Sequence, residues 1–78
     1  MTNLDEREKE LVAIGAAYAG NCIPCMEYHI PAARKAGLTD EQIQEAIELA
    51  DKVKQVPAKK VLDTAKLLIA GGGGGIKV

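Results

Sequence analysis

Three reactive side chains fall within eight consecutive residues of this 78-residue chain. Cys22 and Cys25 are its only cysteines, and His29 is its only histidine. If this stretch is helical, the three side chains lie at i, i+3 and i+7, on one face of the helix. Two thiols with an imidazole one turn away supply an attacking thiolate, a second thiol that resolves it and a proton acceptor. The spacing therefore predicts thiol chemistry.

The Cys22-Ile23-Pro24-Cys25 motif is expected at the beginning of a helix. Unpaired N–H groups and the positive end of the helix dipole stabilise an anion at that position, so cysteines there tend to be reactive. The two-residue spacer lets the sulfurs close a disulfide without unwinding the helix. His29, one turn beyond Cys25, is expected to accept its proton directly or through water.

A thiol–imidazole pair still needs a group that orients the ring and takes the proton onward, and Glu10 is the candidate. Glu10 lies on the face of a predicted first helix that also carries Ile14 and Ala17. A carboxylate on such a face is costly unless it has a partner. Glu27 is nearer to the cysteines in sequence, but it lies off their helical face, so we expect it on the surface.

A metal site is the main alternative for the cysteine pair. Zinc takes four ligands, and the chain offers Cys22, Cys25, His29 and Glu10. The absence of a second C-x-x-C favours redox chemistry, so we expect neither a metal nor another cofactor. Two hypotheses follow: an enzyme that uses the thiols, or a non-catalytic metal-binding or redox-sensing module.

Helix start and stop residues predict an all-α chain of about four helices, with the C-x-x-C at the N-terminus of the second. The first helix is expected to be capped by Thr2 or Asn3 and to stop at Gly20. The second is expected to be capped by Asn21 and to end at Gly37. Proline within that second helix is expected to bend it, or to break it into two shorter helices.

The second half of the chain is expected to form two helices. Thr39 and Gln42 form a capping-box pattern that opens the third helix, and Val56-Pro57 marks the start of the fourth. The apolar stripe of the third helix comprises Ile43, Ala46, Ile47, Ala50 and Val53. The buried face of the fourth comprises Val61, Ala65, Leu68 and Ile69. We therefore divide the chain into a helical domain, residues 1–70, and a flexible Gly-rich tail, residues 71–78.

Composition limits the possible partners. The chain has no Trp or Phe and is rich in Ala, so its core is small, and we expect subunits to associate. The net charge is −1 without a Lys/Arg stripe, which argues against nucleic acid. The polar, acidic N-terminus does not resemble a signal peptide, and no apolar segment is long enough to span a membrane. We therefore expect a cytoplasmic protein, in which a close cysteine pair is typically catalytic or metal-binding.

Glu10, Cys22, Cys25 and His29 together give the pattern E-x11-C-x2-C-x3-H. This pattern resembles the core motif of the alkylhydroperoxidase D (AhpD-like) family, within the carboxymuconolactone decarboxylase superfamily. The resemblance extends over roughly residues 8–68. It implies an all-helical fold that assembles into trimers or hexamers. It also implies a thiol-dependent peroxidase or disulfide oxidoreductase that takes a small hydroperoxide or disulfide and a dithiol reductant.

The resemblance also assigns roles to the four residues. Cys25 would be the peroxidatic thiol, Cys22 the resolving thiol, His29 the base and Glu10 the end of the proton relay. In thiol exchange, however, the outer sulfur of Cys22 is the more accessible one, so the order of attack stays open. The chain departs from the family at Pro24, where longer members often have a histidine. Members that decarboxylate carboxymuconolactone generally lack the cysteine pair, so its presence favours thiol chemistry.

Overall fold

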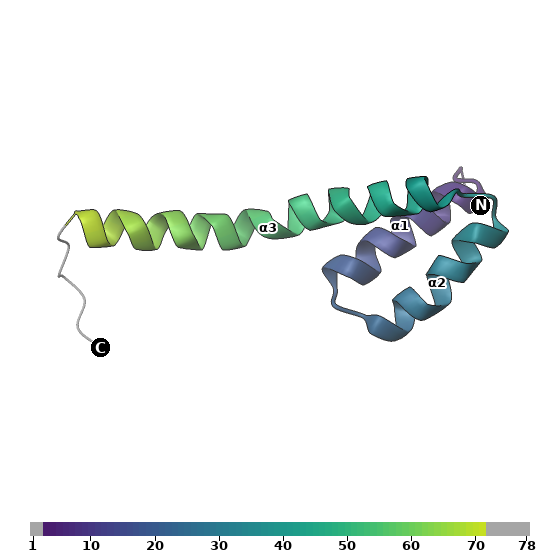
Figure 1. Ribbon diagram of the computed structural model, residues 1–78, viewed down its shortest axis with the longest axis horizontal. Coiled ribbons are helices and arrows are strands. Elements are labelled where there is room, and N and C mark those ends of the chain that lie inside the picture. Colours follow the sequence, from purple (N-terminus) through teal and green to yellow (C-terminus); the bar gives the residue numbers. More distant parts are fainter. Residues whose placement is uncertain (1–2, 72–78) are drawn as a thin grey trace.

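The computed structural model describes residues 3–71, and this part of the chain contains three α-helices (Figure 1). They are α1 (Glu6–Ala19), α2 (Ile23–Lys35) and α3 (Asp40–Ala70). α1 packs against α2 and against the first half of α3, and the rest of α3 extends away from both (Figure 1). The all-α prediction is confirmed, whereas the prediction of about four helices is wrong.

α1 begins at a capping box formed by two acidic residues. The Asp5 carboxylate accepts a hydrogen bond from the Glu8 N–H at 2.8 Å, and the Glu8 carboxylate accepts one from the Asp5 N–H at 2.9 Å. Each carboxylate thereby satisfies an N–H that the first turn leaves unpaired. The expectation of a cap at Thr2 or Asn3 is therefore wrong, and Thr2 itself lies outside the described residues.

α2 runs as one helix through Pro31, so the alternative of two shorter helices is wrong. It ends as expected at Gly37, whose φ of +102° lies in the left-handed region that favours glycine. The Gly37 N–H donates to the Arg34 carbonyl at 3.0 Å, and the Leu38 N–H donates to the Ala33 carbonyl at 3.1 Å. This pair of bonds is a Schellman motif, and it turns the chain back toward α3 with Leu38 in the core.

α3 begins at the predicted capping box and then continues past the predicted boundary. The Thr39 hydroxyl accepts from the Gln42 N–H at 3.1 Å, and the Gln42 side chain accepts from the Thr39 N–H at 2.9 Å. Pro57 lies inside the helix rather than at the start of a new one. Val56, directly before it, has no side-chain acceptor that could cap a new helix, and the apolar stripe continues in phase beyond it. These two features explain why the expected boundary is wrong.

The predicted buried face of the fourth helix is exposed. Val61 is 70% exposed, Leu68 56% and Ile69 80%, because this half of α3 has no neighbour among residues 3–71 (Figure 1). Although α3 is 31 residues long, neither it nor another helix within residues 3–71 combines the length and apolarity that a membrane crossing requires. Gly71 caps the end of α3, and the predicted tail beyond it lies outside the described residues.

The core lies where α1, α2 and the first half of α3 meet. It consists of Ile14 from α1, Ala33 from α2, Leu38 from the connecting turn and Ile43 from α3. Four partly buried side chains extend this core: Leu11, Met26, Ile30 and Ile47. Burial of each large aliphatic side chain contributes about 1.5–3 kcal/mol. The core fixes the face of α1 that α2 contacts, and this is the face on which Glu10 lies.

Candidate active site

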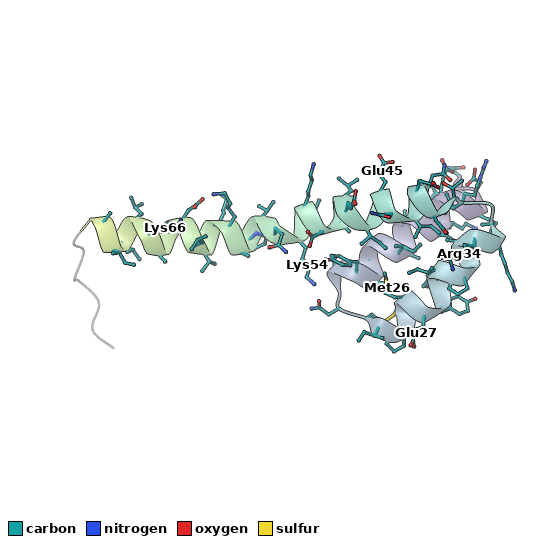
Figure 2. The ribbon with its side chains drawn as sticks, in the orientation of Figure 1. Met26, Glu27, Arg34, Glu45, Lys54 and Lys66 are labelled. Atoms are coloured by element: carbon teal, nitrogen blue, oxygen red, sulfur yellow. A yellow bond between two sulfur atoms is a disulfide. The ribbon has the colours of Figure 1, made fainter. Side chains whose placement is uncertain are left out.

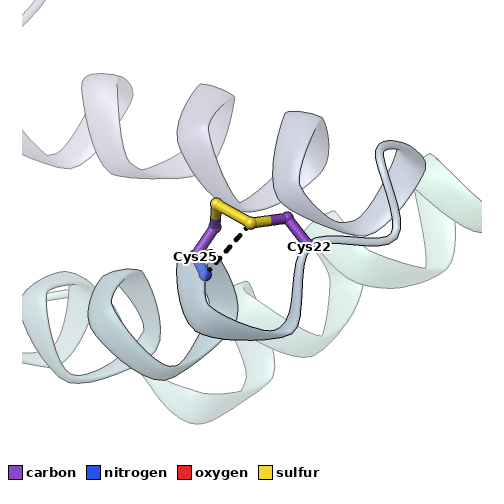
Figure 3. The surroundings of a disulfide bond; sticks show 2 residues. All are labelled: Cys22 and Cys25. Carbon is purple, nitrogen blue, oxygen red and sulfur yellow. Dashed lines mark hydrogen bonds between the residues drawn. A yellow bond between two sulfur atoms is a disulfide. The ribbon is translucent and has the colours of Figure 1, made fainter.

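Cys22 and Cys25 form a disulfide at the start of α2, with their Cα atoms 5.2 Å apart (Figure 3). Cys22 is also the N-cap of this helix, since its Sγ accepts a hydrogen bond from the Cys25 N–H at 3.2 Å. The expected cap at Asn21 is therefore wrong by one residue. The position of the cysteine pair at the helix N-terminus is confirmed, and one of its sulfurs occupies the place where an anion is best stabilised.

A tight turn between α1 and α2 places Cys22 at the N-cap of α2. Asn21 has a φ of 56°, in the left-handed region that asparagine tolerates better than most residues. The Cys22 N–H donates to the Ala17 carbonyl at 2.9 Å, and the Asn21 N–H donates to the Tyr18 carbonyl at 3.1 Å. The end of α1 and the start of the cysteine motif are thus joined by direct backbone hydrogen bonds.

A polar cluster from α3 holds this turn, and the sequence analysis did not predict it. Lys54 extends toward the turn (Figure 2), where it donates to the Asn21 side chain and to the Tyr18 carbonyl, the latter at 3.4 Å. The Lys54 ammonium also lies 5.1 Å from the centre of the Tyr18 ring. These contacts link α3 directly to the residues that precede the disulfide.

The Tyr18 hydroxyl donates to the Asp51 carboxylate at 2.7 Å. This hydrogen bond, with a second from Gln55, lowers the pKa of Asp51 from its ordinary value, because both bonds favour the charged carboxylate. The same bond raises the pKa of Tyr18, since ionisation of the phenol would remove its proton from the carboxylate. Tyr18 therefore links α1 to α3 through a partly buried hydrogen bond.

The structure brings Glu10 and His29 together. The His29 Nδ1 and the Glu10 Oε1 are 2.8 Å apart, and the two side chains are 28% and 16% exposed respectively. A carboxylate has no proton to give, so Nδ1–H is the donor, and in the neutral ring Nε2 is left as an acceptor. Glu10 therefore has the partner that a carboxylate on this face of α1 requires, and the ring tautomer is fixed.

His29 also lies on the cysteine side of α2. Residues four apart in a helix have Cβ atoms about 5–6 Å apart, and His29 follows Cys25 by four. His29 is thus one helical turn beyond Cys25, and its ring bonds to the Glu10 carboxylate of α1. The rings of Tyr28 and His29 are packed edge to face with their centroids 4.9 Å apart, although Tyr28 is itself 69% exposed.

Met26 and Glu27, the two residues that follow Cys25, lie on different sides of α2. Glu27 is exposed on the outer side of α2, as expected, and Met26 packs against the core (Figure 2). Within residues 3–71, no group of three or more His, Cys, Asp and Glu side chains is arranged to hold a metal ion. In this disulfide form the sulfurs are bonded to each other and are not thiolate ligands.

Comparison with known proteins identifies the family. The model of the carboxymuconolactone decarboxylase family matches residues 2–66. A curated relative, "Uncharacterized protein 4 in cox locus" of Paracoccus denitrificans, is 43% identical over 51 residues, which is 65% of this chain and 46% of the relative. The chain thus spans about half the length of this relative, and no solved structure matches it. Because the family model matches most of the chain, this protein belongs to the carboxymuconolactone decarboxylase family.

Proposed function

We propose that the protein is a thiol-dependent peroxidase or disulfide oxidoreductase in which Cys22 and Cys25 are the redox pair. The observation that carries this proposal is the Glu10–His29 hydrogen bond one helical turn from the disulfide. A base that is oriented by a carboxylate and lies next to a nucleophile is the common arrangement for activating that nucleophile. Decarboxylation does not need a dithiol, so the pair favours redox chemistry over the reaction that gives the family its name.

In the peroxide route the reduced protein begins the cycle. Nε2 of His29 accepts the Cys25 proton, and the thiolate attacks the terminal oxygen of the hydroperoxide. The O–O bond breaks, Cys25 becomes a sulfenic acid, and the departing alkoxide takes the proton from the imidazolium to leave as an alcohol. The Cys22 thiol then attacks the Cys25 sulfur, releases water and forms the disulfide.

A dithiol reductant closes the cycle by thiol exchange. One of its thiolates attacks the Cys22–Cys25 disulfide to form a mixed disulfide, and its second thiol releases the reduced protein. The Cys25 N–H that bonds to the Cys22 sulfur also stabilises a thiolate on Cys22. This contact supports Cys22 as the sulfur that leaves first, so that the reductant is bonded to Cys25 in the mixed disulfide.

Separate Cys25→Ser and Cys22→Ser variants test the proposal. Turnover is measured with tert-butyl hydroperoxide and dithiothreitol, and disulfide reduction with a small aromatic disulfide. We expect both variants to lose steady-state turnover, because the complete cycle needs both sulfurs. Full turnover in both variants would show that the dithiol mechanism is wrong. Glu27→Gln, a substitution of an exposed residue on the same helix, serves as the control for effects unrelated to the site.

A further inference from the structure

The second half of α3 is an apolar arm that packs against no other part of residues 3–71. We call residues 57–70 the arm, and every residue in it is exposed. Its large aliphatic side chains are between 51% and 80% exposed: Val61, Leu62, Leu67, Leu68 and Ile69. A helix that presents so much apolar surface is typical of a segment that packs against another chain.

A groove of matching character runs between α1 and the first half of α3. Its volume is about 610 Å³, and its lining is mostly apolar. Leu11, Val12 and Gly15 line it from α1, and Ala46, Leu49 and Val53 line it from α3. A Cβ added to Gly15 would meet no atom within 4 Å, so the floor of the groove is open at this glycine. Small residues at such positions allow another helix to approach closely.

The arm and the groove match in length. Along α3 the groove extends from Gln42 to Val53, which at 1.5 Å per residue is about 17 Å. The arm extends for about 20 Å by the same measure. A shallow apolar face on the arm, formed by Lys60, Val61, Thr64, Ala65 and Leu68, continues the stripe that lines the groove. Both surfaces therefore lie on nearly the same side of one continuous helix.

The arm and the groove also match in charge. The first half of α3, residues 40–56, carries five carboxylates and two lysines, whereas the arm carries three lysines and one carboxylate. The carboxylates of the first half are Asp40, Glu41, Glu45, Glu48 and Asp51, and the lysines of the arm are Lys59, Lys60 and Lys66. Two copies of α3 that run antiparallel would place each basic arm beside an acidic half-helix. Parallel copies would place like charges side by side.

We propose that the arm of one copy occupies the α1–α3 groove of a second copy, and that the second copy returns the same contact. This arrangement has two-fold symmetry and fills both grooves with one type of contact. The two-fold axis crosses α3 near Gln55, midway between the groove and the arm. The arm cannot reach its own groove while α3 is continuous through Pro57, because the helix carries it away from α1. This pairing is independent of the thiol chemistry.

The first test is the molar mass of the full chain, measured by light scattering over a range of concentrations. We expect an even number of copies for the wild type. Leu68→Glu places a charged carboxylate on the face of the arm that would enter the groove. Leu49→Lys places a charged ammonium group in the lining of the groove. We expect each to raise the dissociation constant by about 100-fold or more, as for a central apolar anchor. Leu62→Glu, on the far side of the same arm, is the matched control and is expected to keep the pair.

The second test is complementation, which separates loss of contact from loss of folding. A mixture of the Leu68→Glu and Leu49→Lys chains contains one intact arm and one intact groove, so it is expected to recover a two-copy mass that neither chain forms alone. A monomeric or odd-numbered wild type would overturn the proposal. So would a Leu62→Glu effect equal to that of Leu68→Glu, or a mixture that stays monomeric.

Discussion

Glu10→Gln tests whether the carboxylate that holds His29 contributes to the chemistry of the thiol. The substitution keeps the shape of the side chain and removes its charge. Two opposite unit charges about 4 Å apart interact by about 4 kcal/mol at an effective dielectric constant of 20. Glu10 and His29 are 16% and 28% exposed, so water screens part of this interaction. We therefore expect the imidazolium that forms as the thiol ionises to lose about 2 kcal/mol of stabilisation, which corresponds to about a 30-fold slower reaction.

The assay is a single turnover of fully reduced protein with excess hydroperoxide, in which thiol loss is followed after an acid quench. This measurement reports the first attack without contribution from the reductant. Glu27→Gln is the matched control, since it makes the same substitution at an exposed position of α2. We expect its rate to stay within about twofold of the wild type, as for most surface substitutions.

Alkylation by iodoacetamide distinguishes a chemical role of Glu10 from a structural one. If Glu10 supports proton transfer through His29, the Glu10→Gln variant forms less thiolate and is alkylated more slowly. If the substitution only loosens the packing of α1 on α2, the cysteines become more accessible and alkylation becomes faster. A Glu10→Gln variant that reacts with hydroperoxide as fast as the wild type, or no slower than Glu27→Gln, would refute the proton relay.

Three further predictions concern single residues. In Cys22→Ser a single hydroperoxide turnover is expected to leave a sulfenic acid on Cys25, trapped by dimedone and seen by mass spectrometry; modification elsewhere would contradict the assigned roles. The lowered pKa of Asp51 predicts a contribution to stability that is present above its unfolded value of about 3.8 and lost as pH falls through the folded value. In Tyr18→Phe, the melting temperature is expected to fall less steeply as the pH is lowered, because the hydrogen bond to Asp51 is gone. The same pH dependence as in the wild type would show that this bond does not contribute. Gly37→Ala is expected to cost about 1 kcal/mol in denaturant unfolding, because its φ is +102°; an unchanged midpoint would contradict this.

The candidate site was predictable because its features are local or recur in one helix. Cys25 and His29 are related by helical spacing, which a helix of any length enforces, and Cys22 is the cap directly before that helix. Glu10 required one more step: a carboxylate on the apolar face of α1 needs a partner, and the partner lies on the helix that packs there. The sequence alone did not establish the distance between the two side chains, because that depends on how closely α1 and α2 pack.

The N-cap of α2 was misassigned because capping rules favour side-chain oxygens. Asn21 satisfies those rules, but its left-handed backbone places it in the turn rather than at the cap. The sulfur of Cys22 takes the position instead. An N-cap side chain usually accepts from the N–H of the third helical residue, and Cys25 is the third residue of α2 when Cys22 is the cap. The three-residue spacing of the two cysteines was therefore the feature of the sequence that could have indicated this cap.

The boundary at Pro57 and the Tyr18–Asp51–Lys54 cluster depend on tertiary structure. Proline favours the first turn of a helix, but it does not enforce a break when the residue before it cannot cap and the stripe continues in phase. In this cluster Tyr18 bonds to Asp51, which is 33 positions away in the sequence, and to Lys54, which is 36 positions away. No short sequence spacing relates these residues. The exposed arm shows the same limitation, since apolar periodicity predicts that a face is covered but does not say which chain covers it.

The Cys22 sulfur serves two purposes, and this affects the interpretation of any substitution made there. The atom that we propose exchanges electrons is also the atom that caps the first turn of α2. Serine keeps an acceptor at that place, whereas alanine removes it at a cost of about 1 kcal/mol. The difference in stability between the serine and alanine variants thus measures the contribution of the cap. The loss of activity that both variants have in common measures the role of Cys22 in electron exchange. In the proposed cycle, each oxidation and reduction of the pair would also alter the charge at the N-terminus of α2, where the helix dipole acts.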